Sequence, residues 1–326
     1  MRILGGQLGL ALALILAAPA TAEAPQVKVS SPQAIKGVGS VVIGAFNVGF
    51  IFQSVDNTKK TGGMIGAFGG ATQARSVLAG VTPEMMQAIV DAAYADFKAR
   101  LQAGGFTVAA ADGLFGGPDF ARVKPLAAPY EAGVQLDKRS TGKATFLKPA
   151  AVPAMFMLPG DITASGFSGM GVTMSAGTNE YAVSQYAKSS GQTVIDVTYL
   201  VDFSDVRRPG AFSMAGVQVN SGMSVAGGFS RVTVVTPSGK SATVTLNDPA
   251  AVEGDFADKA DTTKDKAMQS ALNVAGGVAA AFGAGTFQFG KSRTYTFTAK
   301  PAYVDGAVKA TTLANDRIVT QLALLR

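Results

Sequence analysis

Apolar residues are concentrated between Val41 and Phe52, where β-branched and aromatic side chains alternate with glycines. This composition is typical of a buried strand. A bend at Gly44 or Gly49 is expected, because a glycine inside a strand marks a bulge or a close approach of another backbone. The pattern therefore predicts a strand at residues 41–52.

The apolar positions change to helical spacing after Thr82, which is a good N-cap residue, and Pro83 suits the first helical position. A glycine at position 104 ends the pattern, as glycines often do after a helix. The apolar stripe consists of Met86, Val90, Ala93, Phe97 and Leu101. We expect a helix at residues 83–103 and a strand at residues 106–109, which together give a β-α-β start.

Residues 161–246 alternate over short distances and predict mostly β structure. Residues 190–206 form the strongest strand pattern. Residues 228–246 predict a hairpin whose turn is supplied by a Pro-Ser-Gly sequence. Two further stretches, 166–188 and 211–228, alternate small or polar residues with apolar ones and are also expected to be strands.

Residues 110–160 are rich in proline and predict loops, with short strands at residues 144–147 and 154–158. Residues 248–285 predict a helix in their middle, and residues 287–326 a pair of strands followed by a short apolar end. In that middle part the spacing places three carboxylates on one helix face; they are Asp255, Asp258 and Asp261. The calcium-loop spacing is absent, so a solvated helix is the better interpretation.

These elements predict a β-rich α+β fold, with a small α/β core domain, antiparallel strands and hairpins. If the subunits form a ring, the hairpins of several subunits would together form one oligomeric barrel. We divide the chain into a leader at 1–22, an α/β segment at 23–160, a hairpin segment at 161–246, and a helix with terminal strands at 247–326.

The leader has a basic residue at Arg2, an apolar run from Leu8 to Ala18, and small residues at the end. This order is typical of a secretory signal peptide, and we expect cleavage between Ala22 and Glu23. The apolar run is too short to remain as a membrane anchor. We therefore expect an exported protein in the periplasm or outer membrane of a bacterial cell envelope.

The chain contains neither cysteine nor histidine. This composition excludes disulfides, thiol catalysis, serine triads that use histidine, and the common zinc sites. Charged residues make up 15% of the chain and the net charge is +6. A typical soluble domain has about 25% charged residues, so the sparse charge indicates a surface that is partly covered by other subunits or by membrane. The basic residues form no runs, which argues against a nucleic-acid partner.

Residues 285–292, GTFQFGKS, match the phosphate-binding loop pattern letter for letter. A working loop of this kind needs a helix after its serine, to bring the helix dipole to the phosphate. Residues 293–298 instead alternate like a strand. The same Gly-Lys pair recurs at 141–146 and 237–243 before other alternating residues, so we interpret all three as turns and expect no nucleotide.

Any remaining chemistry must use carboxylates, lysine, tyrosine, serine or threonine. Paired carboxylates could cleave glycosides, although the sequence does not fix their separation. The candidates are Asp161, Asp196, Asp202 and Asp205, for which structural roles are favoured. Residues 140–143 match the S-x-x-K motif of serine penicillin-binding enzymes, and residues 60–62 match their K-T-G motif. In those enzymes S-x-x-K comes first and K-T-G last, and here the order is reversed. We expect a non-enzymatic protein with no cofactor and no metal, and a carboxylate-based hydrolase is the last of the alternatives.

The order of elements over residues 40–246 resembles the curli secretion channel (CsgG-like) family. A strand, a helix and a strand are followed by two alternating stretches, each of which precedes a strong strand, VIDVTYLVDF or SRVTVVT. Two features depart from the family: this chain lacks the cysteine of a lipoprotein, and residues 247–326 have no counterpart. The resemblance implies a ring of subunits whose hairpins form one outer-membrane barrel.

We therefore predict an exported component of outer-membrane export or surface-structure assembly, a homo-oligomer that contacts the outer membrane or an exported protein. The alternative is a soluble periplasmic binding or scaffold protein; a single-chain barrel fits less well, because the chain starts as α/β. The candidate membrane or oligomer contacts are Met170, Val172, Met174, Val217, Val219, Met223 and Val225.

Overall fold

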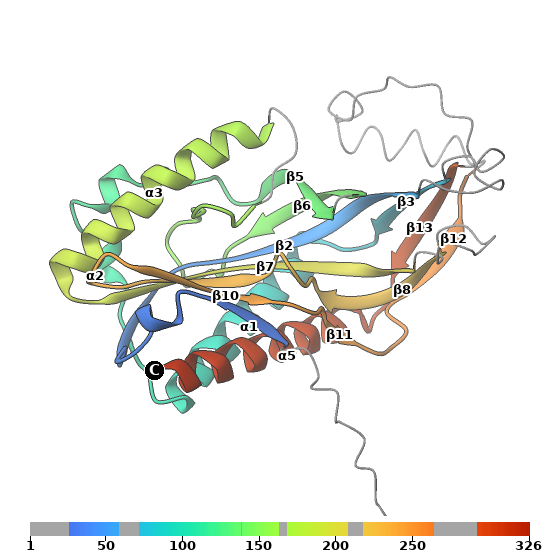
Figure 1. Cartoon of the computed structure of the whole chain (residues 1–326). Coiled ribbons are helices and arrows are strands. Elements are labelled where there is room, and N and C mark those ends of the chain that lie inside the picture. The colour runs from blue at the N-terminus through green and yellow to red at the C-terminus, as the bar shows by residue number, and fades with distance from the viewer. Residues whose placement is uncertain (1–25, 59–71, 138, 163–167, 208–217, 264–291) are drawn as a thin grey trace, which may run out of the picture.

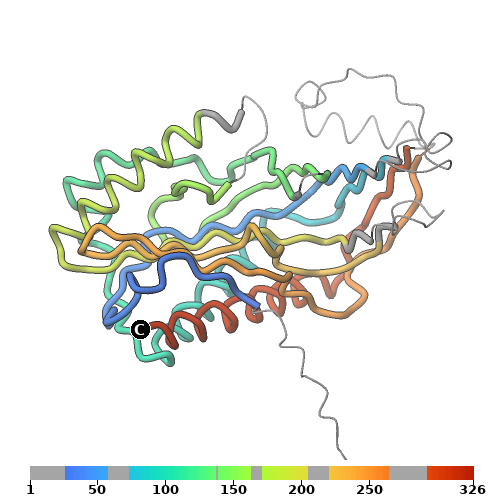
Figure 2. Tube along the Cα trace, viewed as in Figure 1, coloured from blue at the N-terminus to red at the C-terminus, as the bar shows by residue number. Residues whose placement is uncertain are grey.

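The computed structural model describes residues 26–58, 72–137, 139–162, 168–207, 218–263 and 292–326. These residues form a mixed α+β fold around one large sheet, as the ribbon and the Cα trace show (Figures 1 and 2). The predicted fold class is therefore confirmed. The sheet has 13 strands in its described part, most of them antiparallel, and it is open, not closed into a barrel.

The strands are β1 (Val27–Ser30), β2 (Ser40–Thr58), β3 (Thr72–Ala79), β4 (Thr107–Ala109), β5 (Tyr130–Asp137), β6 (Ser140–Leu147), β7 (Thr193–Arg207), β8 (Gln218–Val225), β9 (Arg231–Val235), β10 (Ser241–Leu246), β11 (Ala250–Val252), β12 (Ala257–Asp261) and β13 (Ser292–Ala299). The helices are α1 (Pro83–Ala103), α2 (Asp112–Phe115), α3 (Ser168–Ser190) and α5 (Tyr303–Leu325), with short 3₁₀ turns η1 (Pro32–Ala34) and η2 (Phe120–Arg122).

The main path of the sheet runs β1-β10-β9-β7-β2-β3-β13-β12, and strands from all three segments expected after the leader belong to it. Strand β2 organises the sheet because it has different neighbours along its length. Its first half pairs in parallel with β7, and its second half pairs with β3 and β6. Beyond Phe50, β7 therefore leaves β2, and its far half pairs with β8 instead.

Helices cover both faces of the sheet at the end where β2 begins (Figure 1). Helices α1 and α5 pack together on one face, and α3 covers the other. The larger core lies on the α1 and α5 side, where Phe46 contacts Phe97 and Tyr199 with ring centroids 5.6 and 5.8 Å apart. Tyr199 also donates a hydrogen bond to Asn315 of α5 at 2.9 Å, and Asn315 donates to the carbonyl of Ala93 at 3.0 Å. This polar link joins β7, α5 and α1 inside an apolar core.

Several predicted elements are confirmed. Helix α1 has the predicted bounds, and the Thr82 side chain accepts a hydrogen bond from the Met85 amide at its start. The strand predicted at residues 41–52 is β2, which continues to Thr58. The hairpin of β9 and β10 also forms, with Gly239 in a left-handed turn conformation.

The strand predicted at residues 166–188 is wrong, because residues 168–190 form helix α3. A segment in which small residues alternate with apolar ones fits the two-residue period of a strand and the 3.6-residue period of a helix. In the structure this segment follows the helical period. The buried positions of α3 recur every three or four residues; they are Ala176, Asn179, Ala182, Val183, Tyr186 and Ala187. The last four of them pack on the sheet in a separate small core with Val42, Phe156 and Val194.

The end of the chain also differs from the prediction. The short apolar end is the 23-residue helix α5, whose buried face includes Tyr303, Ala307 and Ala314. Residues 257–261 form strand β12, so Asp255, Asp258 and Asp261 do not share a helix face; Lys300 pairs with the first two of them. Residues 154–158 form no strand beyond a single bridge at Met155. Gly142 and Lys143 lie within strand β6 and not in a turn.

Candidate functional site

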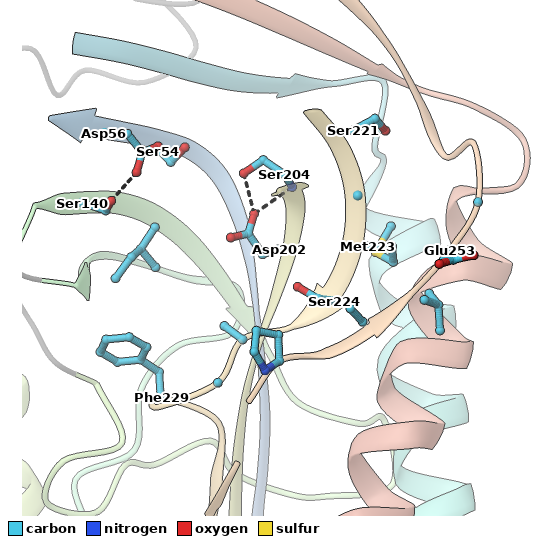
Figure 3. Close-up of a pocket in the computed structure, with 18 residues that line it drawn as sticks. Ser54, Asp56, Ser140, Asp202, Ser204, Ser221, Met223, Ser224, Phe229 and Glu253 are labelled. Carbon is cyan, nitrogen blue, oxygen red and sulfur yellow. Dashed lines mark hydrogen bonds between the residues drawn. The ribbon is translucent and has the colours of Figure 1, made fainter. Parts of the chain in front are cut away.

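A pocket of about 730 Å³ opens where β7 separates from β2 (Figure 3). Strands β2 and β6 form one wall, β7 lies in the middle, and β8 and β11 form the opposite wall. The lining residues are Ser54, Asp56, Leu136, Ser140, Asp202, Ser204, Ser221, Gly222, Met223, Ser224, Ala226, Gly227, Phe229, Pro249, Ala251, Val252, Glu253 and Gly254. The volume lies in the usual range for small-molecule sites, about 300 to 1,000 Å³.

The first wall owes its polarity to the second half of β2. An irregularity in the pairing with β6 lies between Ile51 and Gln53, after which Ser54 and Asp56 point to the same face. Both side chains are buried within the fold, with 2% of their surface exposed. Ser140 of β6 lies opposite Asp56 in register and donates a hydrogen bond to its carboxylate. The β-bulge therefore places a carboxylate and two hydroxyls on the pocket wall.

Asp202 lies in the middle of the pocket, where β7 has left β2 (Figure 3). Its Oδ1 accepts hydrogen bonds from the amide and the hydroxyl of Ser204, both at 2.9 Å. Burial raises the pKa of Asp202 to about 6; the bonds from Ser204 lower the pKa, and the charge of Asp56 raises it. The group therefore exchanges a proton just below neutral pH.

The opposite wall is formed by β8, β11 and the residues next to them. Ser221 and Ser224 of β8 line it, followed by Glu253 after β11, and Phe229 closes the lower side in the view of Figure 3. The hydroxyls of Ser54 and Ser221 are buried and have no hydrogen-bond partner among the described residues. A buried hydroxyl without a partner costs roughly 1–3 kcal/mol, so these two groups are suited to contact a molecule in the pocket.

A second polar cluster lies further back along the same face of β7, under the loop before α3. Asp161 accepts hydrogen bonds from the amide of Leu158 at 2.6 Å and from Nε of Arg231 at 3.1 Å. Asp196 is buried beside Asp161, and the two carboxyl groups are close enough to form a hydrogen bond when one of them is protonated. Burial, and then the charge of Asp161, raises the pKa of Asp196 well above its usual range. One arginine faces two carboxyl groups here, which favours a shared proton.

The structure separates the four aspartates proposed from the sequence. Asp161 and Asp196 belong to the buried cluster, and Asp202 belongs to the pocket. Asp205 lies on β7 opposite Asn220, and its side chain lies outside the described part of the structure. Within the described ranges, no three metal-ligating side chains come close enough to share an ion. The chemistry that the pocket offers is recognition of a polar molecule and exchange of one proton.

The seven predicted contact residues are divided among different environments. Met170, Val172 and Met174 lie on helix α3 instead of a strand, and Met174 has 73% of its surface exposed. Met223 and Val225 are buried in the core of this chain, so lipid cannot reach them. Nothing is described for Val217 or for the side chain of Val219. Contact with membrane or with other subunits stays a prediction for Met170, Val172, Met174, Val217 and Val219.

Most of the phosphate-loop match, residues 285–291, lies outside the described residues, as do residues 1–25 with the leader. The serine at its end, Ser292, begins strand β13. A strand after the serine is what the alternating pattern predicted, and it leaves the match without the helix that a phosphate-binding loop needs.

Of the 18 residues that line the pocket, only Asp202 and Met223 were candidates from the sequence; the polar residues that were missed include Ser54, Asp56, Ser221 and Glu253. The strand at 41–52 was predicted to end before the first two of them. Residues 53–58, QSVDNT, contain one apolar residue, Val55, so the hydrophobic pattern carried no signal that would have extended the strand.

Comparison with protein-family models, with curated proteins and with solved structures finds no match. The likeness to the curli secretion channel family therefore stays an expectation from the sequence. In the parts of the chain that the structure describes, no helix combines the length and the hydrophobicity needed to cross a membrane.

Proposed function

We propose that this chain is an exported, non-enzymatic binding protein of the cell envelope, and that the pocket between β2 and β8 holds a small polar molecule. The leader pattern at residues 1–22 supports export. The observation that carries the binding role is the pocket itself, which has a ligand-sized volume and a wall of carboxylates and buried hydroxyls. Such groups are retained in a folded interior where a partner satisfies them.

The test compares the mature chain with a variant whose pocket is filled. Ser221→Phe adds an aromatic ring at the β8 wall and removes a hydroxyl that lacks a described partner. Ser238→Phe, in the exposed turn between β9 and β10, is the matched control. Both proteins and the parent are incubated with small molecules extracted from the cell envelope and analysed by native mass spectrometry.

We expect the parent and Ser238→Phe to retain a small molecule that Ser221→Phe does not retain. Equal retention by all three proteins, or retention by none, would reject the pocket as a binding site. Intact-mass measurement of the exported protein should also give a chain that starts at Glu23, and a retained Met1 would remove the support for export.

A second candidate is the oligomeric component of outer-membrane export or surface assembly that the sequence favoured. One observation supports it: the strand pairs β2 with β3, β7 with β8, and β12 with β13 all run to the same end of the molecule (Figure 1). That end lies away from the helix-covered part of the sheet. Three strand pairs at one end are the arrangement from which a ring of subunits would extend hairpins.

The second candidate is tested by the oligomeric state of the protein extracted from membranes with detergent. A homo-oligomer in native mass spectrometry would support it, and a monodisperse monomer that is soluble without detergent would reject it. Val225→Asp is unsuitable as a probe of membrane insertion, because Val225 is buried in the core and the variant would unfold the sheet.

A further inference from the structure

The charged residues that line the pocket are all acidic. Among its 18 lining residues, three are carboxylates, five are serines, and none is a lysine or an arginine. The carboxylates are Asp56, Asp202 and Glu253, and they come from three different parts of the wall. A low-dielectric pocket that holds carboxylates without a cationic side chain is complementary to a positively charged occupant.

The hydrogen-bonding capacity of the pocket indicates an occupant with several N–H or O–H groups. Asp202 accepts two hydrogen bonds from Ser204 and one from the amide of Phe203, and a carboxylate has about four lone-pair sites, so it can accept a further donor. The hydroxyls of Ser54 and Ser221, on opposite walls, have no described partner. An ammonium group has three donors and no acceptor, so it can donate to the Asp202 carboxylate and to a serine oxygen at the same time.

Two observations favour an organic cation over a metal ion or a neutral sugar. The described residues contain no cluster of three metal-ligating side chains, so the carboxylates surround a volume and do not converge on a point. Phe229 adds an aromatic ring to the lining, and aromatic faces attract ammonium groups. A neutral sugar would supply no charge to compensate the carboxylate of Asp202.

We infer that the pocket recognises a small molecule with a primary ammonium group, with Asp202 as the principal counter-ion and the free hydroxyls of Ser54 and Ser221 as further contacts. This inference rests on the proposed binding function and names the class of ligand. Asp56 and Glu253 set the negative potential of the pocket around Asp202.

The experiment uses two pairs of probes that differ only at the charged group. Isothermal calorimetry on the mature chain at pH 7.5 compares D-glucosamine with D-glucose, and cadaverine with 1,5-pentanediol. We expect at least one amine to bind at least about tenfold more tightly than its neutral partner, because the neutral partner cannot pair with the charge of Asp202. Asp202→Asn, which keeps the shape of the side chain, should reduce amine binding at least about a hundredfold.

Asp258→Asn is the matched control, because it removes one carboxylate from the exposed strand β12, outside the pocket, and should leave binding unchanged. At pH 5 amine binding to the parent should fall about tenfold, because Asp202 is then mostly protonated. The other titratable groups facing Asp202 are Asp56 on β2, Glu253 after β11 and Tyr303 on α5. Tyr303 stays neutral at pH 5 and at pH 7.5, since burial raises its pKa.

The possible failures are distinguishable. If D-glucose or the diol binds as tightly as its amine, or if Asp202→Asn keeps the amine, the ammonium assignment is overturned. If no probe binds, the assignment is overturned as well. In each of these cases a neutral molecule retained by the parent but not by Ser221→Phe would leave the proposed binding function standing.

Discussion

Replacing Asp202 by asparagine should change how the stability of the protein depends on pH. The free energy of unfolding of the variant, compared with that of the parent, should be higher at neutral pH than at acidic pH. The parent carboxyl has a raised pKa of about 6 in the folded chain, chiefly because of burial, against an ordinary value of 3.8. The folded state therefore holds its proton more tightly than the unfolded state. The stabilisation that comes from this protonated carboxyl is fully present below about pH 4 and is lost as the pH rises through 6.

The expected magnitude follows from the size of the shift. A difference of about two pKa units, at about 1.4 kcal/mol each, corresponds to about 3 kcal/mol between pH 4 and pH 7. Asparagine does not titrate, so the variant lacks this loss. The ionised carboxylate accepts stronger hydrogen bonds from Ser204 than asparagine does, but this difference is already contained in the folded-state pKa of about 6 and is not counted again.

The assay is urea denaturation of the parent and Asp202→Asn at pH 4 and pH 7, followed by circular dichroism. The free energy of unfolding of the variant minus that of the parent should be about 3 kcal/mol larger at pH 7 than at pH 4. Asp258→Asn, on an exposed carboxylate outside the pocket, should show a difference close to zero. If the Asp202→Asn difference is the same at both pH values, the carboxyl of Asp202 does not have a raised pKa in the folded chain, and the description of the pocket is wrong.

Three further changes test other parts of the fold. Asp196→Asn should reduce the loss of stability that occurs as the pH rises above about 4, because the pKa of this buried carboxyl is raised in the folded chain, as it is for Asp202. An unchanged pH profile of the free energy of unfolding would contradict the shared proton of the cluster. Tyr199→Phe should lower the free energy of unfolding by about 1–3 kcal/mol in urea, because it leaves the buried oxygen of Asn315 without its donor, and a loss below about 0.5 kcal/mol would argue against this link. Gly49→Ala should cost about 1–3 kcal/mol, because its Cβ would lie 2.6 Å from the ring of Phe146; a melting temperature equal to that of the parent would show that the sheet is looser here than described.

Local patterns determined the elements whose signal is contained in a few consecutive residues. Thr82 and Pro83 start helix α1 because the side chain caps a free amide and the proline needs no hydrogen bond, and neither effect depends on distant residues. The turn at Gly239 and the strand that begins at Ser292 were predicted for the same reason. The absence of cysteine and histidine limited the chemistry of the protein without any structure.

Helix α3 was decided by tertiary packing. Residues 168–190 contain glycine, serine and threonine between apolar residues, and this texture fits a strand as well as a helix. The sheet beside α3 offers an apolar surface at Val42 and Val194, and the helix buries Ala182 and Val183 against it. Burial on this surface outweighs the weak local preference.

The pocket could not be derived from the sequence, because it depends on pairing between distant strands. Ser54 and Asp202 are 148 positions apart in the sequence, and they line one pocket because β7 leaves β2 beyond Phe50. A one-residue bulge near Phe52 then decides which side chains of β2 face the pocket. The sequence by itself determined which polar groups the chain possesses, and the register of the sheet decided which of them meet.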